Sequence, residues 1–80
     1  MASIPSSGVV LFHAQGCHLC DRAREVLERV GVAYESVDIT GVPELEARYR
    51  EWLPVVEIDG ARAFVYYVDE SALRRKVSQT

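Results

Sequence analysis

Cysteine is scarce in this sequence: Cys17 and Cys20 are the only two among its 80 residues. Small secreted proteins that depend on disulfides carry a larger, spread-out set that ties distant segments together. The sequence therefore does not predict a disulfide-stabilised extracellular scaffold. In the cytoplasm, a single close pair of cysteines is typical of a catalytic or metal-binding site.

Long apolar segments and an excess of positive charge are also absent. Residues 1–8 are small and polar and have no basic start, so they predict neither a signal peptide nor a membrane span. The 9 Lys and Arg residues against 12 Asp and Glu residues give a net charge of −3, whereas a nucleic-acid-binding protein needs a basic face. We therefore expect a cytoplasmic protein with no nucleic-acid or membrane partner.

Short runs of apolar residues make up much of the sequence. A hydrophobic share of 49% in a chain this short predicts one domain over residues 1–80, with an ordered core at about residues 8–77. The continuous apolar run at residues 9–13 predicts a buried strand. Apolar residues with helical spacing then predict a helix from about residue 17 or 18 to Val30, with an inner face of Ala23, Val26, Leu27 and Val30.

A second strand is expected at residues 32–39, which makes the first strand, the helix and this strand a parallel crossover. Pro43 suits the first position of a second helix. That helix has one apolar stripe, formed by Val42, Leu45, Tyr49 and Trp52.

The last third of the chain predicts a hairpin and a closing helix. Residues 55–58 and 62–67 read as strands, and Asp59-Gly60 between them is a strong hairpin signal, so the two strands must be antiparallel. Asp69 can cap the final helix. The order β-α-β-α-β-β-α predicts an α/β fold with a four-stranded mixed sheet and helices on both faces.

The two cysteines stand where the first strand leads into the first helix. Cys17 lies at the helix N-terminus, where free N–H groups and the helix dipole favour a negative charge. A thiolate is stabilised there, and the thiolate is the nucleophilic form of cysteine. We therefore expect Cys17 to attack a disulfide and Cys20, one turn further along, to resolve the mixed disulfide.

Three other interpretations of the cysteine pair stay open. A disulfide closing so short a loop contributes only about 2 kcal/mol, which is a weak reason for a purely structural bond. Zinc could be ligated by the two thiolates with His13 and His18, or an iron–sulfur cluster could be shared with a second chain. A chain with this scaffold could also serve as an interaction protein without turnover.

Several other side chains have both a functional and a structural interpretation. His18 could tune the Cys17 thiolate or could be a solvated residue of the first helical turn, while His13 is expected to be a satisfied structural histidine. Glu57 is expected on an exposed face or in an ion pair with an arginine rather than as a buried proton carrier. For the aromatic residues we expect core packing rather than a peptide groove; these are Trp52, Tyr66 and Tyr67.

Taken together, these motifs resemble glutaredoxin and, more closely, the bacterial glutaredoxin-like proteins. The resemblance rests first on the motif Gly-Cys-His-Leu-Cys-Asp at residues 16–21, placed between a strand and a helix. It continues over about residues 8–77 through Val37-Asp38-Ile39, Pro43-Glu44-Leu45, Leu53-Pro54-Val55-Val56 and Ile58-Asp59-Gly60. It implies a thioredoxin-like fold and thiol–disulfide oxidoreductase activity.

The resemblance also implies roles for residues outside the cysteine motif. Pro54 should be a cis-proline lying against the cysteines, and the Leu53 backbone could pair, strand-like, with a bound glutathione or peptide. Asp69 matches an aspartate that binds the glutathione amine. The implied partners are a disulfide-containing protein or glutathione and a reductant protein. We expect a monomer with no tightly bound cofactor, for which glutathione could serve as a co-substrate.

The sequence departs from the usual glutaredoxin pattern at four places. Ala14 stands where those enzymes have a Lys or Arg, and His18-Leu19 stands where they have Pro-Tyr. Trp52-Leu53 replaces Thr-Val, and Tyr66-Tyr67-Val68 replaces a Gly-Gly stretch before the aspartate. These departures concern the contacts to glutathione rather than the fold.

Overall fold

The computed structural model describes residues 8–78 and confirms the predicted order of elements. Each observed strand begins and ends within two residues of its predicted limits. The elements are β1 (Val9–His13), α1 (His18–Val30), β2 (Tyr34–Asp38), α2 (Pro43–Tyr49), the 3₁₀ turn η1 (Arg50–Trp52), β3 (Val55–Ile58), β4 (Ala61–Val65) and α3 (Glu70–Ser78). Within the described residues, no helix combines the length and the apolar character needed to cross a bilayer.

The four strands form one mixed sheet in the order β2-β1-β3-β4. β1 pairs in parallel with β2, so that Val9 lies opposite Tyr34, and pairs antiparallel with β3 on its other side. β3 and β4 are antiparallel and are joined at Asp59 and Gly60, whose φ angles of 55° and 83° suit a tight hairpin turn. The predicted crossover and the predicted hairpin are therefore both confirmed.

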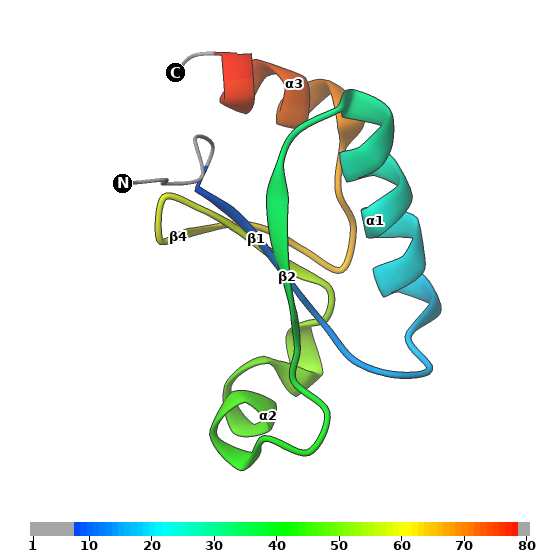
Figure 1. Cartoon of the computed structure of the whole chain (residues 1–80), viewed down its shortest axis with the longest axis vertical. Helices are drawn as coiled ribbons and strands as arrows, with labels where there is room; N and C mark the ends of the chain where they lie inside the picture. The colour runs from blue at the N-terminus through cyan, green and yellow to red at the C-terminus, as the bar shows by residue number, and fades with distance from the viewer. Residues whose placement is uncertain (1–7, 79–80) are drawn as a thin grey trace.

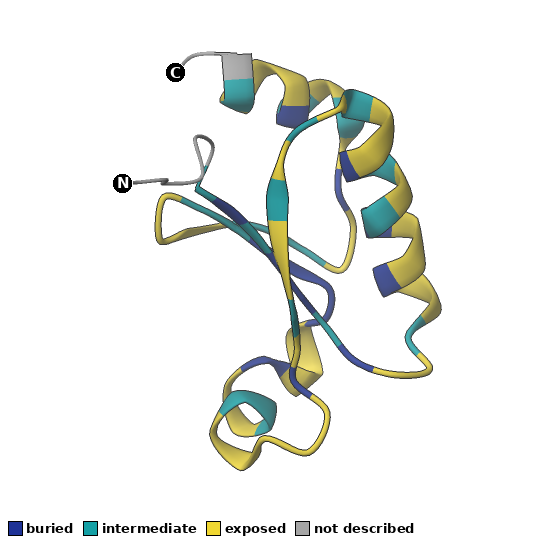
Figure 2. Cartoon of the chain, viewed as in Figure 1, coloured by how far each residue is buried: buried dark blue, intermediate teal, exposed yellow. Residues whose placement is uncertain are grey.

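Helices α1 and α3 pack against the same face of the sheet (Figure 1). The helical spacing predicted for α1 turns its apolar residues inward, and Figure 2 shows its outer surface as mostly exposed. Glu70 at the start of α3 bonds Arg29 of α1 at 2.9 Å and Arg74 of its own helix at 3.0 Å. The buried core on this face consists of Val9, Leu11, Ala23, Leu27, Val56, Val68 and Leu73.

The short helix α2 packs at one end of the opposite face (Figure 1). Tyr49 is buried there and stacks on Phe12 of β1, with ring centroids 4.1 Å apart. The predicted apolar stripe holds only in its middle, because Val42 precedes the helix in an extended conformation and Trp52 follows in the 3₁₀ turn. A 3₁₀ turn has 3.0 rather than 3.6 residues per turn, so it rotates the next side chain away from the α-helical stripe.

Candidate redox site

The site begins in the turn between β1 and α1, at the edge where β1 and β2 both end. The His13 carbonyl accepts a hydrogen bond from the Ile39 N–H at 2.8 Å, and the Gln15 N–H donates to the Thr40 hydroxyl at 3.1 Å. Gly16 has a φ of 76°, which a residue with a side chain adopts less readily. These features hold the turn so that the residue after Gly16, Cys17, becomes the N-cap of α1.

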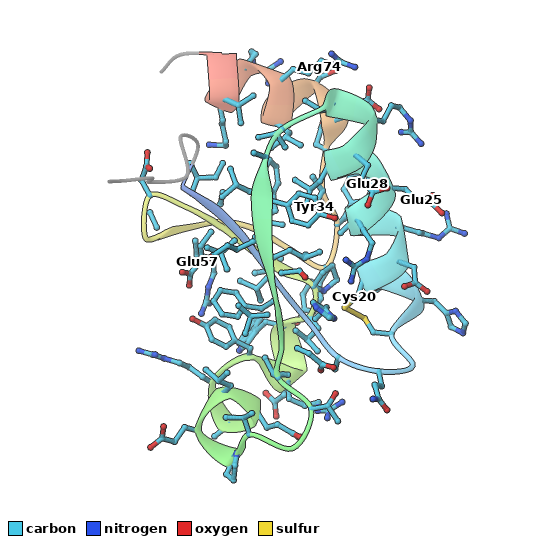
Figure 3. All side chains as sticks on the ribbon, viewed as in Figure 1. Cys20, Glu25, Glu28, Tyr34, Glu57 and Arg74 are labelled. Atoms are coloured by element: carbon cyan, nitrogen blue, oxygen red, sulfur yellow. A yellow bond between two sulfur atoms is a disulfide. The ribbon has the colours of Figure 1, made fainter. Side chains whose placement is uncertain are left out.

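Cys17 and Cys20 form a disulfide at the N-terminal end of α1 (Figure 3). Their Cα atoms are 5.2 Å apart, within the usual range for a disulfide. Cys17 is half-buried, whereas Cys20 is only 2% exposed. The pair therefore offers one accessible cysteine and one sheltered cysteine, which suits the predicted roles of attacker and resolver.

The backbone of α1 donates directly to the more exposed sulfur. The Cys20 N–H lies 3.1 Å from Cys17 Sγ, so the side chain of the N-cap satisfies one of the free N–H groups of the first turn. After reduction, the same N–H would donate to a Cys17 thiolate. A charged acceptor makes such a bond stronger, and the positive end of the helix adds to the effect.

The segment before β3 contributes to the same apolar cluster as the cysteines. Leu53 shares a hydrophobic cluster with Cys20, and Cys17 packs against that cluster. The Leu53–Pro54 peptide bond is cis, as the resemblance to glutaredoxins implies, and Pro54 is fully buried. The Pro54 carbonyl accepts a 2.9 Å hydrogen bond from the Tyr66 N–H, which fixes the end of β4 to this segment.

The two histidines do not assemble with the cysteines into a metal site. Among residues 8–78, no group of three or more His, Cys, Asp or Glu side chains is placed to hold a metal ion. His18 is exposed at the start of α1, and its side chain has no partner within the part of the chain that the structure describes. A zinc site built within one chain from Cys17, Cys20, His13 and His18 is therefore not formed.

His13 is half-buried at the end of β1. Burial lowers the pKa of its imidazole, and the positive charge of Arg24 lowers it further, while Asp38 and Asp21 act in the opposite direction. Its ring makes no hydrogen bond within the described residues, so the expected role of a satisfied structural histidine is not supported. The neutral imidazole is the form that this position favours.

Asp69 caps α3, as predicted. Its Oδ1 atom accepts a hydrogen bond from the Ala72 N–H at 3.1 Å. Capping alone explains why an aspartate stands at this position, and no bound ligand is needed to explain it. Its role toward the glutathione amine stays a prediction of the resemblance.

Glu57 takes neither of its expected positions. It is half-buried on β3 and accepts a 2.9 Å hydrogen bond from the Tyr49 hydroxyl. Within residues 8–78 it forms no ion pair, although Arg62 lies opposite it in the β3–β4 register. Figure 3 shows Glu57 well away from the disulfide, so it does not serve the cysteines.

Core packing was the wrong prediction for three aromatic residues. Trp52, Tyr66 and Tyr67 are 41%, 47% and 72% exposed. Tyr66 and Tyr67 follow the last residue of β4, so the alternation of a strand no longer directs them to the core. Tyr66 is bonded to Pro54 through its backbone, and Tyr66 and Tyr67 line a groove together with Leu19 of the cysteine motif, so the exposed-groove interpretation that the sequence left open fits these two residues better.

The fold and the Cys-x-x-Cys pair at its first helix define the class: this is a thioredoxin-like domain. The X-ray structure of protein XcR50 from X. campestris is similar, with 30% identity and a TM-score of 0.78, over 90% of this chain and 97% of that chain. A buckwheat glutaredoxin solved with glutathione has a TM-score of 0.68 at 19% identity, over 94% of this chain and 76% of that chain. The second likeness shows a shared fold.

The chain belongs to the glutaredoxin-like family. Residues 8–78 match the family described as Glutaredoxin-like domain (DUF836). An uncharacterized protein of Mycobacterium tuberculosis is 32% identical in an alignment that covers 90% of this chain and 84% of the relative. The resemblance drawn from the sequence is thereby confirmed at the level of family and fold.

Proposed function

We propose that the protein is a dithiol oxidoreductase that reduces disulfides, with Cys17 as the attacking residue and Cys20 as the resolving residue. The observation that carries the proposal is the 3.1 Å hydrogen bond from the Cys20 N–H to Cys17 Sγ at the positive end of α1. This bond favours the Cys17 thiolate over the thiol. The difference in exposure supports the division of roles, because a substrate reaches Cys17 before the sheltered Cys20.

The reaction proceeds by two thiol–disulfide exchanges. The Cys17 thiolate attacks one sulfur of the substrate disulfide, the substrate S–S bond breaks, and the other substrate sulfur leaves as a thiolate and takes a proton from water. Cys20 then loses its proton to water and attacks Cys17 Sγ. The mixed disulfide breaks, and the second substrate sulfur leaves as a thiolate that is protonated in turn.

The net result transfers two electrons and two protons from the protein dithiol to the substrate. A dithiol reductant, either a small thiol or a reductant protein, must return the Cys17–Cys20 disulfide to the dithiol. In the proposed complex, Leu53 and Pro54 form the wall beside the sulfurs, and the Leu53 backbone pairs with the substrate chain. Turnover of this kind suits a reducing compartment such as the cytoplasm.

A trapping experiment tests these roles. Reduced Cys20→Ser should form a stable mixed disulfide with a small disulfide such as bis(hydroxyethyl) disulfide, detected by intact mass as one added hydroxyethylthio group. Reduced Cys17→Ser is the matched control and should form the adduct far more slowly, because Cys20 is 2% exposed. Equal labelling of the two variants would contradict the assignment of attacker and resolver.

A further inference from the structure

A groove lined by exposed apolar side chains lies beside the redox site. The structure exposes five large apolar side chains within residues 8–78, and three of them, Leu19, Tyr66 and Tyr67, line this one groove. Its volume is about 190 Å³, and its walls are α1 on one side and residues 66–68 on the other. We call it the α1 groove. A concentration of exposed apolar surface of this kind marks an interaction site.

The α1 groove reaches the helical turn that carries the two cysteines, because Leu19 of that turn lines it. Leu19 stands between Cys17 and Cys20 in the sequence and is 48% exposed. The opposite wall is fixed by the 2.9 Å hydrogen bond from the Tyr66 N–H to the Pro54 carbonyl. A chain bound at the sulfurs would therefore direct a neighbouring side chain into the groove.

Tyr66 lines the groove with its backbone in a strained conformation. Its φ angle is 67°, in the left-handed region that disfavours residues with a side chain by roughly 1–2 kcal/mol. Glycine would occupy this position without that penalty. Strain of this kind is retained mainly at functional sites, and here it turns an aromatic ring toward Trp52, at 6.0 Å between ring centroids.

Trp52 is held in place although it is 41% exposed. One contact is the Tyr66 ring, and another is the Arg62 guanidinium, whose central carbon lies 5.9 Å from the Trp52 ring centroid. A ring that is already ordered loses little conformational entropy when a ligand covers it. Trp52 does not line the α1 groove itself, but its ring adjoins Tyr66, which does.

The charges along the α1 groove largely cancel. Arg22 and Glu25 both line it, and Arg29 at its other end is paired with Glu70 at 2.9 Å. Glutathione carries two carboxylates and one ammonium and would require several matched charges. A balanced, mainly apolar groove instead suits an uncharged apolar side chain.

The geometry points to a polypeptide disulfide as the substrate class, with a large apolar side chain next to the reacting cysteine and buried in the α1 groove. This inference rests on the proposed function, because it names the substrate of the same two exchange steps. The substrate backbone lies along Leu53, its sulfur meets Cys17, and its apolar side chain contacts Leu19, Tyr66 and Tyr67. Glutathione is then a poor substrate.

Two short peptide disulfides test the inference. The probes are symmetrical disulfide dimers of acetyl-Gly-Phe-Cys-Gly-amide and of acetyl-Gly-Ser-Cys-Gly-amide, with oxidised glutathione and bis(hydroxyethyl) disulfide measured in parallel. The readout is the second-order rate of thiol release by the reduced protein. We expect the Phe peptide to react about tenfold faster than the Ser peptide, the discrimination typical of an apolar pocket, and faster than oxidised glutathione.

Two variants test whether the preference for the Phe peptide arises in the α1 groove. Tyr67→Ser should reduce the Phe-to-Ser rate ratio at least about threefold, and Tyr67 is exposed enough for the fold to tolerate the change. Val42→Ser is the matched control, because Val42 is 40% exposed but does not line the groove, and its rate ratio should equal that of the unmodified protein. Far-UV circular dichroism checks that both variants are folded.

The results of these experiments distinguish a failure of the substrate inference from a failure of the proposed oxidoreductase function. A Phe-to-Ser ratio near one, an undiminished ratio in Tyr67→Ser, or faster reduction of oxidised glutathione than of either peptide overturns the inference while leaving the oxidoreductase intact. Failure to release thiol from any disulfide, including bis(hydroxyethyl) disulfide, overturns both. The expected ratios support both.

Discussion

The backbone N–H of Tyr66 donates a 2.9 Å hydrogen bond to the carbonyl of Pro54, so the segment after β4 is fixed to the wall of the redox site. Tyr66 reaches this position with a φ of 67°. The same residue thus links the end of the hairpin to the cis-proline segment and carries backbone strain. Its neighbour Tyr67 has no positive φ, so substitutions at the two tyrosines can be compared to measure the strain at Tyr66.

Replacing Tyr66 with glycine should cost less stability than replacing Tyr67. Both changes raise the entropy of the unfolded chain, but only Tyr66→Gly also removes a left-handed penalty of about 1 kcal/mol. Tyr67→Gly is the control and should destabilise by about 0.5–1 kcal/mol, because Tyr67 has no such penalty to remove. Urea unfolding midpoints measure both. Equal losses of stability in the two variants would contradict the account of strain at Tyr66.

The Tyr49 hydroxyl should contribute measurably to stability. Tyr49→Phe keeps the stacking on Phe12 but leaves the half-buried Glu57 without its partner, which should cost about 1 kcal/mol. Tyr34→Phe is the control, because its 3.2 Å hydrogen bond to Glu28 is exposed and should contribute less. Chemical denaturation of the two variants measures how much stability each hydrogen bond contributes. A larger loss of stability in Tyr34→Phe than in Tyr49→Phe would contradict this ranking.

The cap of α3 should depend on the Asp69 side chain. Asp69→Ala removes the 3.1 Å hydrogen bond to the Ala72 N–H and should cost about 1 kcal/mol, whereas Asp69→Asn preserves a good cap. Thermal unfolding of the two variants is the measurement. If Asp69→Asn unfolds as readily as Asp69→Ala, capping is not the main role of this side chain.

Acid should weaken the fold through His13. Burial and Arg24 lower the pKa of His13 below its unfolded value, so the unfolded chain binds more protons. The contribution is fully present above pH 6.5 and is lost as the pH falls through the folded pKa. His13→Gln should flatten the stability profile between about pH 7 and 5, measured by urea unfolding; an unchanged slope would exclude His13 as the cause.

Much of the fold could be predicted because local patterns and tertiary packing agree. The apolar run of β1, the helical spacing of α1 and the Asp59-Gly60 turn each specify one structure, and the sheet needs all three. The placement of Cys17 followed for the same reason, since Gly16 and the start of α1 fix it at the helix N-terminus.

The surroundings of the site could not be predicted in the same way. The exposure of Trp52 depends on a change from α-helix to 3₁₀ turn at Arg50, which the spacing of apolar residues does not reveal. The exposure of Tyr66 depends on a positive φ that tyrosine intrinsically disfavours. Both are set by tertiary contacts, and the two exposed rings lie next to each other, with centroids 6.0 Å apart.

The pKa of Cys17 in the reduced protein tests the central claim most directly. Thiolate absorbance in the ultraviolet is followed against pH for the reduced protein and for Cys17→Ser, and the difference gives the Cys17 titration. The hydrogen bond from the Cys20 N–H and the N-terminus of α1 predict a pKa clearly below the value of about 8.5 for free cysteine. A Cys17 pKa at or above that value would contradict the account of an activated thiolate at the start of α1.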